Sequence, residues 1–267
     1  MSKLSRDLSK ARDAYKNRDV ELSKKAHSVF ATEQHQQEKG RYLKSIVYGG
    51  LDGIITTFAV VAGVKGATLS LAIVLILGIA NLLADGMSMG IGDYLSSKSE
   101  IEYQKKERER EAWEVENYPE GEKLELIELY QSKGLSEEDA KTVVDIFSKD
   151  PKTWVDIMMV EELGILEETE SPMGNAIATF ISFVIFGAIP LLTYVLALFI
   201  DTLASNSVLL FTIACISTGI TLFVLGALKT NITGKNLWIS GLETLLVGAA
   251  AAGAAYLIGF GLSFLVN

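Results

Sequence analysis

The sequence predicts an all-α polytopic membrane protein, with five transmembrane helices and a hydrophilic helical domain inserted between the second and the third. Of the 267 residues 49% are hydrophobic and 21% are charged, but the two classes are separated along the chain. Long apolar runs occupy roughly 46–95 and 175–266, and nearly all charge lies in 1–45 and 96–172. A spanning helix needs about 20 apolar residues, and the two apolar runs have room for five such helices.

The limits of the five spans follow from the charge-free stretches. The stretch Leu69–Leu83 has no charged residue, whereas a helix on the surface of a soluble protein carries a polar face, so a soluble all-α protein is disfavoured. The predicted spans are Ile46–Val64, Leu69–Leu95, Asn175–Ile200, Val208–Leu228 and Leu237–Val266. They divide the chain into an N-terminal helical segment (1–40), the first two spans (41–97), the inserted domain (98–170) and the last three spans (171–267).

The distribution of Lys and Arg predicts the orientation. All but one of the 24 basic residues fall on one side of the five spans, and Lys65 is the exception. Cytosolic loops carry the excess of positive charge. We therefore expect the N-terminus and the inserted domain in the cytosol and the C-terminus in the lumen.

The hydrophilic parts of the chain read as helices. Residues 1–40 predict a polar helix that carries both histidines, His27 and His35, as solvated residues. The second span is expected to continue as a charged helix to Asn117, where Pro119 and Gly121 end it. Three more helices are expected at about 122–133, from the capping residue Ser136 onward, and from Asp150-Pro151 to about Glu168.

Polar side chains inside the apolar helices indicate a cation path. Asn81, Asp85 and Met89 are spaced at i, i+4 and i+8 on one helix face, and Asp52 lies in the first span within Y-G-G-L-D-G. A carboxylate at membrane depth is costly and therefore a functional candidate. In the fifth span Glu243 is either a further carboxylate of the path or an interfacial anchor. Near the cytosolic end of the second span, Asp93 reads as an interfacial residue.

The inserted domain is acidic, with 22 acidic against 10 basic residues in 96–172. Pairs of potential ligands recur at helical spacing, and folding two helices across Pro119 can bring two pairs together. Oxygen-rich sites suit divalent ions, and a thioether favours Fe²⁺ over Mg²⁺ or Ca²⁺. The spacing alone fits a solvated acidic hairpin equally well. The paired residues are Glu111 with Glu114, Glu122 with Glu125, and Met158 with Glu162.

Other classes of function are disfavoured. The acidic domain speaks against binding to nucleic acid or anionic lipid. The sequence shows no nucleophile–base set and no nucleotide-binding glycine loop of the kind that would indicate an enzyme. The single cysteine, Cys215, excludes a disulfide framework and reads as an apolar packing residue. The polar start of the chain does not resemble a cleavable signal peptide.

Four features together resemble the vacuolar iron transporter family, over residues 41 to the end. They are Asp52-Gly53, the run A-D-G-M-S-M-G-I-G-D-Y-L-S-S-K-S-E at 84–100, the glutamate-rich insert, and M-M-V-E-E-L-G at 158–164. The resemblance implies a homodimer in the membrane of a vacuole or another acidic store, with a path lined by the first spans. It also implies that Fe²⁺, and often Mn²⁺, leaves the cytosol in exchange for protons.

The resemblance also implies roles for individual residues. Asp52 matches the pore aspartate of the first span, and Met89 the methionine of the membrane metal site. Asn81 stands where many members have a glutamate. An amide can bind metal but cannot carry a proton, so Asp85 is the candidate proton carrier. A passive divalent channel and a membrane-anchored metal sensor or buffer are the alternative functions. The ligands of the cytosolic domain, which Mn²⁺ or Zn²⁺ could also occupy, match Glu111, Glu114, Glu122, Glu125, Met158 and Glu162.

Overall fold

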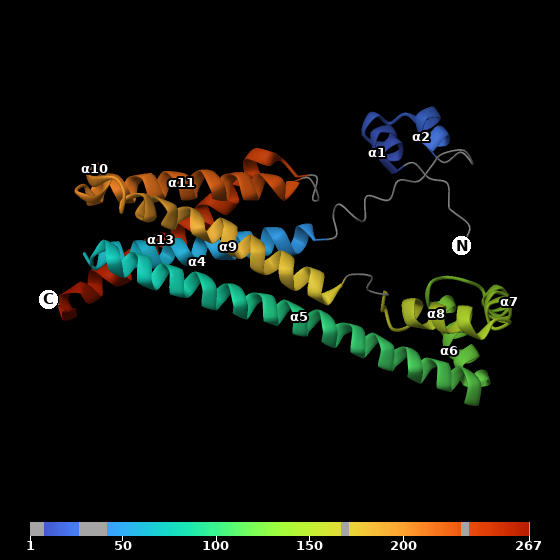
Figure 1. Ribbon diagram of the computed structural model, residues 1–267. Coiled ribbons are helices and arrows are strands. Elements are labelled where there is room, and N and C mark those ends of the chain that lie inside the picture. The colour runs from blue at the N-terminus through green and yellow to red at the C-terminus, as the bar shows by residue number, and fades with distance from the viewer. Residues whose placement is uncertain (1–7, 27–41, 167–170, 231–234, 267) are drawn as a thin grey trace. The chain divides into compact units, whose positions relative to one another are not determined.

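The computed structural model describes residues 8–26, 42–166, 171–230 and 235–266, and these stretches contain helices and connecting turns but no strand (Figure 1). The chain divides into two compact units. One comprises Met1–Leu82 with Ile181–Asn267, and the other comprises Leu83–Phe180.

Five of the described helices are long and apolar enough to cross a membrane, as the sequence predicts. Large apolar side chains remain exposed along them, including Ile76, Ile185, Ile216 and Leu257, and an unpartnered apolar surface of this kind suits contact with lipid. The five helices are α4 (Leu43–Gly66), α5 (Leu71–Asn117), α9 (Pro172–Leu196), α11 (Ser207–Leu228) and α13 (Leu237–Val266).

Glycines allow the helices of the first unit to pack backbone against backbone. A Cβ atom at Gly259 of α13 would overlap the carbonyl of Gly63 in α4, and one at Gly53 of α4 would overlap the carbonyl of Phe183 in α9. Close approach of this type is a general feature of helix contacts in membranes. The four-residue helix α10 (Asp201–Ala204) connects α9 to α11.

Helix α5 is too long to lie entirely within a bilayer. Its 47 residues correspond to about 70 Å at 1.5 Å per residue, against a hydrocarbon thickness of about 30 Å. The charged stretch from Ser99 to Asn117 continues the apolar half without interruption, as predicted. The helix therefore provides both a membrane span and a support for the inserted domain.

Two helices of the inserted domain begin at the predicted caps. The Ser136 hydroxyl accepts a hydrogen bond from the Asp139 N–H (3.1 Å) at the start of α7 (Glu137–Phe147). The Asp150 carboxylate accepts one from the Thr153 N–H (3.1 Å) at the start of α8 (Pro151–Glu161). A side-chain cap satisfies backbone donors that have no partner inside the helix.

Three predictions about the helices were wrong, and two of them concern helix limits. Helix α6 (Pro119–Ser132) begins at Pro119, because a proline in the first turn lacks only an N–H that would be unpaired there. Helix α8 ends at Glu161 instead of about Glu168; Gly164 adopts a φ of +66°, and the Ile165 N–H returns to the Met159 carbonyl (2.8 Å). This reversal ends the helix.

The third correction concerns the N-terminal segment. The predicted single helix is two helices, α1 (Leu8–Asn17) and α2 (Val20–Ala26), because Arg18 between them has a φ of +54°. The Asp19 carboxylate then accepts a hydrogen bond from the Leu22 N–H (3.0 Å) and starts α2. His27 and His35 lie outside the described residues.

The inserted domain has its own apolar core. Trp154 and Met158 of α8 pack with Leu126 of α6 and Val144 of α7, and the end of α5 contributes Val115. Leu126 and Met158 are fully buried. This core fixes α6 and α8 against the charged end of α5, where the predicted ligands lie.

Candidate metal centre

The turn between α5 and α6 brings the two glutamate pairs together. The Tyr118 N–H donates to the Glu114 carbonyl (2.7 Å), and the Glu122 N–H donates to the Tyr118 carbonyl (3.3 Å), so the chain reverses within a few residues. Carboxylate oxygens of Glu111, Glu114 and Glu122 lie within 4.8 Å of one another, and so do those of Glu122, Glu125 and Glu162. Glu122 is common to both groups. The five residues are called the carboxylate cluster below.

Two members of the carboxylate cluster are buried. Glu111 is 1% exposed and Glu122 is 4% exposed. Among the described residues, neither carboxylate oxygen of Glu111 forms a hydrogen bond of normal geometry. Oε2 of Glu122 forms none either. A buried carboxylate whose charge is not compensated costs several kcal/mol, so protons or cations are needed to neutralise this pair.

The acidity of these groups reflects the same cost. Burial raises the pKa of Glu111 to about 7, and the nearby Glu162, Glu114 and Glu125 add to the rise, whereas Arg110 opposes it. Burial also raises the pKa of Glu122 to about 7, together with repulsion from Glu125 and Glu111. The pKa of Glu162 is raised by burial and by Glu125. Glu111 and Glu122 therefore have pKa values close to neutral pH.

One cation reaches the carboxylate cluster among the residues that the structure describes. Arg110 places Nη2 at 2.6 Å from Glu111 Oε1 and Nη1 at 2.5 Å from Glu114 Oε2. Its Nε donates to Glu107 Oε2 at 3.0 Å. The contact with Glu111 is an ion pair by distance alone, since its angles do not make a hydrogen bond. A regular E-x-x-R-E-x-x-E spacing over 107–114 could have revealed this arginine in the sequence.

Met158 is placed in the apolar core, one helical turn before Glu162. It is fully buried beside Leu126 and Trp154, and its carbonyl accepts a hydrogen bond from the Glu162 N–H (3.0 Å). Its packing role is therefore shown, and its role as a thioether ligand stays a prediction.

The predicted residues of the membrane path fall in both units. Asn81, Asp85 and Met89 lie one turn apart on the continuous helix α5, and each is half-buried. The side-chain nitrogen of Asn81 is buried without an acceptor among the described residues. Asp52 is half-buried in α4, where its carbonyl accepts a hydrogen bond from the Thr56 hydroxyl (2.8 Å). A common path through these residues stays a prediction.

Two further acidic residues have partners that the sequence did not indicate. Glu243 is exposed near the start of α13, and Lys229 Nζ, directly after α11, lies 3.6 Å from its carboxylate. The Thr179 hydroxyl of α9 donates to Asp93 Oδ2 of α5 at 2.5 Å. Asp93 therefore takes part in helix packing within the second unit.

Comparisons with known proteins agree on one group of relatives. A family model described as the VIT family matches residues 43–260. The vacuolar iron transporter of Toxoplasma gondii is 41% identical over 273 residues, covering 98% of this chain and 90% of the relative. The vacuolar iron transporter of Plasmodium berghei is 40% identical, and the match covers 93% of this chain and 94% of the relative. Vacuolar iron transporter 1 of Oryza sativa subsp. japonica is 34% identical, and the match covers 86% of this chain and 89% of the relative.

Proposed function

Because this chain belongs to the VIT family, whose matched members are named vacuolar iron transporters, we propose that it carries a divalent metal ion out of the cytosol. It is an integral membrane protein that moves Fe²⁺, and Mn²⁺ as a second cargo, into a vacuole-like acidic store in exchange for protons. The family match supports metal transport into a store. The carboxylate cluster, in which Glu111 and Glu122 are buried, is the single observation that carries the argument for a metal centre in this chain.

The carboxylate cluster would collect the ion on the cytosolic side. Five carboxylates from α5, α6 and the end of α8 provide oxygen ligands of the kind that Fe²⁺, Mn²⁺ and Zn²⁺ accept. With the pKa values of Glu111 and Glu122 at about 7, a divalent ion can displace protons at neutral pH. Met158 would add a thioether from the adjoining core.

The membrane residues would then pass the ion across. Asp52 in α4 and Met89 in α5 are the proposed metal-binding residues of the path, and Asn81 can bind through its amide oxygen. Asp85, one turn from Asn81, is the proposed proton carrier. Entry of a proton from the acidic side neutralises a carboxylate and so weakens its hold on the metal. We place the N-terminus and the carboxylate cluster in the cytosol, and a homodimer with α4 at its centre forms the path.

Transport into sealed proteoliposomes tests this function. An Fe²⁺ indicator is trapped inside, and uptake is measured with and without an acidic interior for the wild type and Asp52→Ala. Uptake that is accelerated by the gradient and lost in the variant is the expected result. Uptake that ignores the gradient but is lost in the variant would favour a passive channel, for which Asn81 is the supporting observation.

A metal sensor or buffer is the remaining alternative. It would show no uptake under either condition, while Mn²⁺ still binds the full-length protein and Glu122→Gln still removes that binding. Such a result would retain the carboxylate cluster as a metal centre and reject the transport path.

A further inference from the structure

Arg110 holds the position of a cation in the carboxylate cluster. Its two terminal nitrogens contact Glu111 and Glu114, whereas its inner nitrogen contacts Glu107. We propose that Arg110 is the built-in counter-ion of the carboxylate cluster, that a divalent ion displaces it from Glu111 and Glu114, and that Glu107 retains it. This inference rests on the proposed function, since it requires the carboxylate cluster to bind metal.

The three contacts of Arg110 suit such a transfer. Glu107 lies one turn earlier on α5 and belongs to neither group of carboxylates that converge within 4.8 Å. The guanidinium can therefore release both terminal nitrogens and keep the hydrogen bond from Nε to Glu107 Oε2 (3.0 Å). The Arg110 side chain is 43% exposed, so water and free space are available on one side for this movement.

The exchange has a consequence for selectivity. A monovalent ion that replaces the guanidinium brings no additional positive charge to Glu111 and Glu114. It therefore gains little attraction to offset the contacts that these carboxylates lose with Arg110. A divalent ion brings one more positive charge beside the buried carboxylate of Glu111, where charge interactions are stronger than in water. Arg110 thus sets a threshold that favours divalent over monovalent cations, since specificity is a difference between two affinities.

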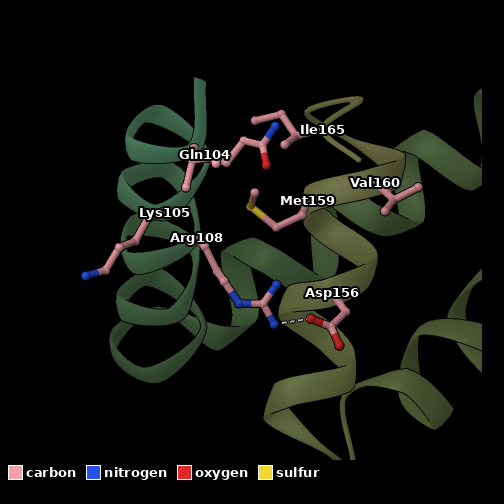
Figure 2. Close-up of a pocket in the computed structure, with 8 residues that line it drawn as sticks. Gln104, Lys105, Arg108, Asp156, Met159, Val160 and Ile165 are labelled. Atoms are coloured by element: carbon pink, nitrogen blue, oxygen red, sulfur yellow. Dashed lines mark hydrogen bonds and ion pairs between the residues drawn. The ribbon is translucent and has the colours of Figure 1, made fainter. Parts of the chain in front are cut away.

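The competing explanation is that Arg110 forms only a surface ion pair, without influence on metal binding, because exposed ion pairs contribute little to stability. Arg108 provides the matched control. It lies two residues earlier on α5, but its guanidinium pairs with Asp156 of α8 at the edge of a pocket that includes Met159 and Ile165 (Figure 2). Substituting either arginine by Gln removes the same charge from the same helix, and only Arg110 contacts the carboxylate cluster.

Mn²⁺ binding to the purified full-length protein at pH 8 tests the proposal. We expect Arg110→Gln to bind Mn²⁺ about tenfold more tightly than the wild type, equivalent to about 1.4 kcal/mol, because no counter-ion has to leave. Arg108→Gln should stay close to the wild type. Equal affinities in the two variants, or weaker binding in Arg110→Gln, would overturn the proposal.

The receiving residue is tested by a second pair of variants. Glu107→Gln should weaken Mn²⁺ binding more than Glu109→Gln, whose carboxylate pairs with Lys105 instead, because Arg110 then loses its alternative partner. In an Arg110→Gln background the two variants should have the same effect. A difference that persists without Arg110 would reject the transfer to Glu107.

Thermal unfolding separates this role from a structural one. Without metal, Arg110→Gln should melt below the wild type, and its melting temperature should rise more on addition of Mn²⁺. A lower melting temperature without a larger Mn²⁺ shift would show a structural role only, and reject the proposal.

Glu122→Gln distinguishes failure of this inference from failure of the proposed metal centre. If that variant loses Mn²⁺ binding while Arg110→Gln matches Arg108→Gln, the inference alone fails. If Glu122→Gln binds Mn²⁺ like the wild type, both fail.

Discussion

Glu111 of α5 and Glu122 of α6 have carboxylate oxygens within 4.8 Å of each other, and both side chains are almost fully buried. Burial is the main cause that raises the pKa of each to about 7, and repulsion from neighbouring carboxylates adds to it. In the proposed function, protons and a divalent ion are alternative occupants of this site. This competition makes both stability and metal affinity depend on pH.

Stability without metal should fall as the pH rises. The pKa of Glu122 is raised in the folded protein from 4.5 to about 7, so between these values the folded state holds more protons than the unfolded state and loses stability with increasing pH. The measurement is the melting temperature in EDTA from pH 5 to 8. The melting temperature of Glu122→Gln should rise relative to that of the wild type as the pH increases over this range. That of Glu128→Gln, a substitution at an exposed position of the same helix, should not. Parallel curves for wild type and Glu122→Gln would contradict the assignment.

Metal affinity should change in the opposite direction. Two carboxyls with pKa values of about 7 must release their protons before Mn²⁺ binds, so the affinity should fall on the order of a hundredfold from pH 8 to pH 6. Titrations in two buffers of different ionisation enthalpy would also count the released protons. Affinity that does not change with pH would place Mn²⁺ on other ligands.

Features that depend on neighbouring residues could be predicted from the sequence. The caps at Ser136 and Asp150 need contacts only three residues away, and both were confirmed. The meeting of Glu111 with Glu122 could be anticipated as well, because a turn at Pro119 joins their helices. The backbone reversal at Arg18 escaped prediction, since a positive φ in a residue other than glycine has no reliable signal in sequence.

Burial and contacts between distant residues could not be predicted. Nothing in the spacing distinguishes the buried Glu122 from the exposed Glu125, because this depends on the core that α8 completes. The bond from Thr179 to Asp93 joins residues 86 positions apart.

Packing of α4 against α13 should be sensitive to substitution of Gly259. A methyl group at Gly259 would overlap the backbone of Gly63, whereas one at Gly261 would meet nothing within 4 Å. Gly259→Ala should destabilise the protein by about 1 to 3 kcal/mol and reduce the melting temperature in detergent. Gly261→Ala serves as the control, with no loss. Equal melting temperatures for the two variants would show that α13 does not approach α4 this closely.

Proton coupling should depend on Asp85. Asn81, one turn earlier on the same face of α5, can donate and accept hydrogen bonds but cannot carry a proton. In proteoliposomes, Asp85→Asn should still take up Fe²⁺ but lose the acceleration by an acidic interior. Adding Asn81→Glu to that variant should restore the acceleration, since a carboxylate returns one turn away. Asp201→Asn, on exposed α10, is the matched control and should behave as the wild type. Gradient-dependent uptake by Asp85→Asn alone would move the proton carrier to another residue, with Asp52 the next to test.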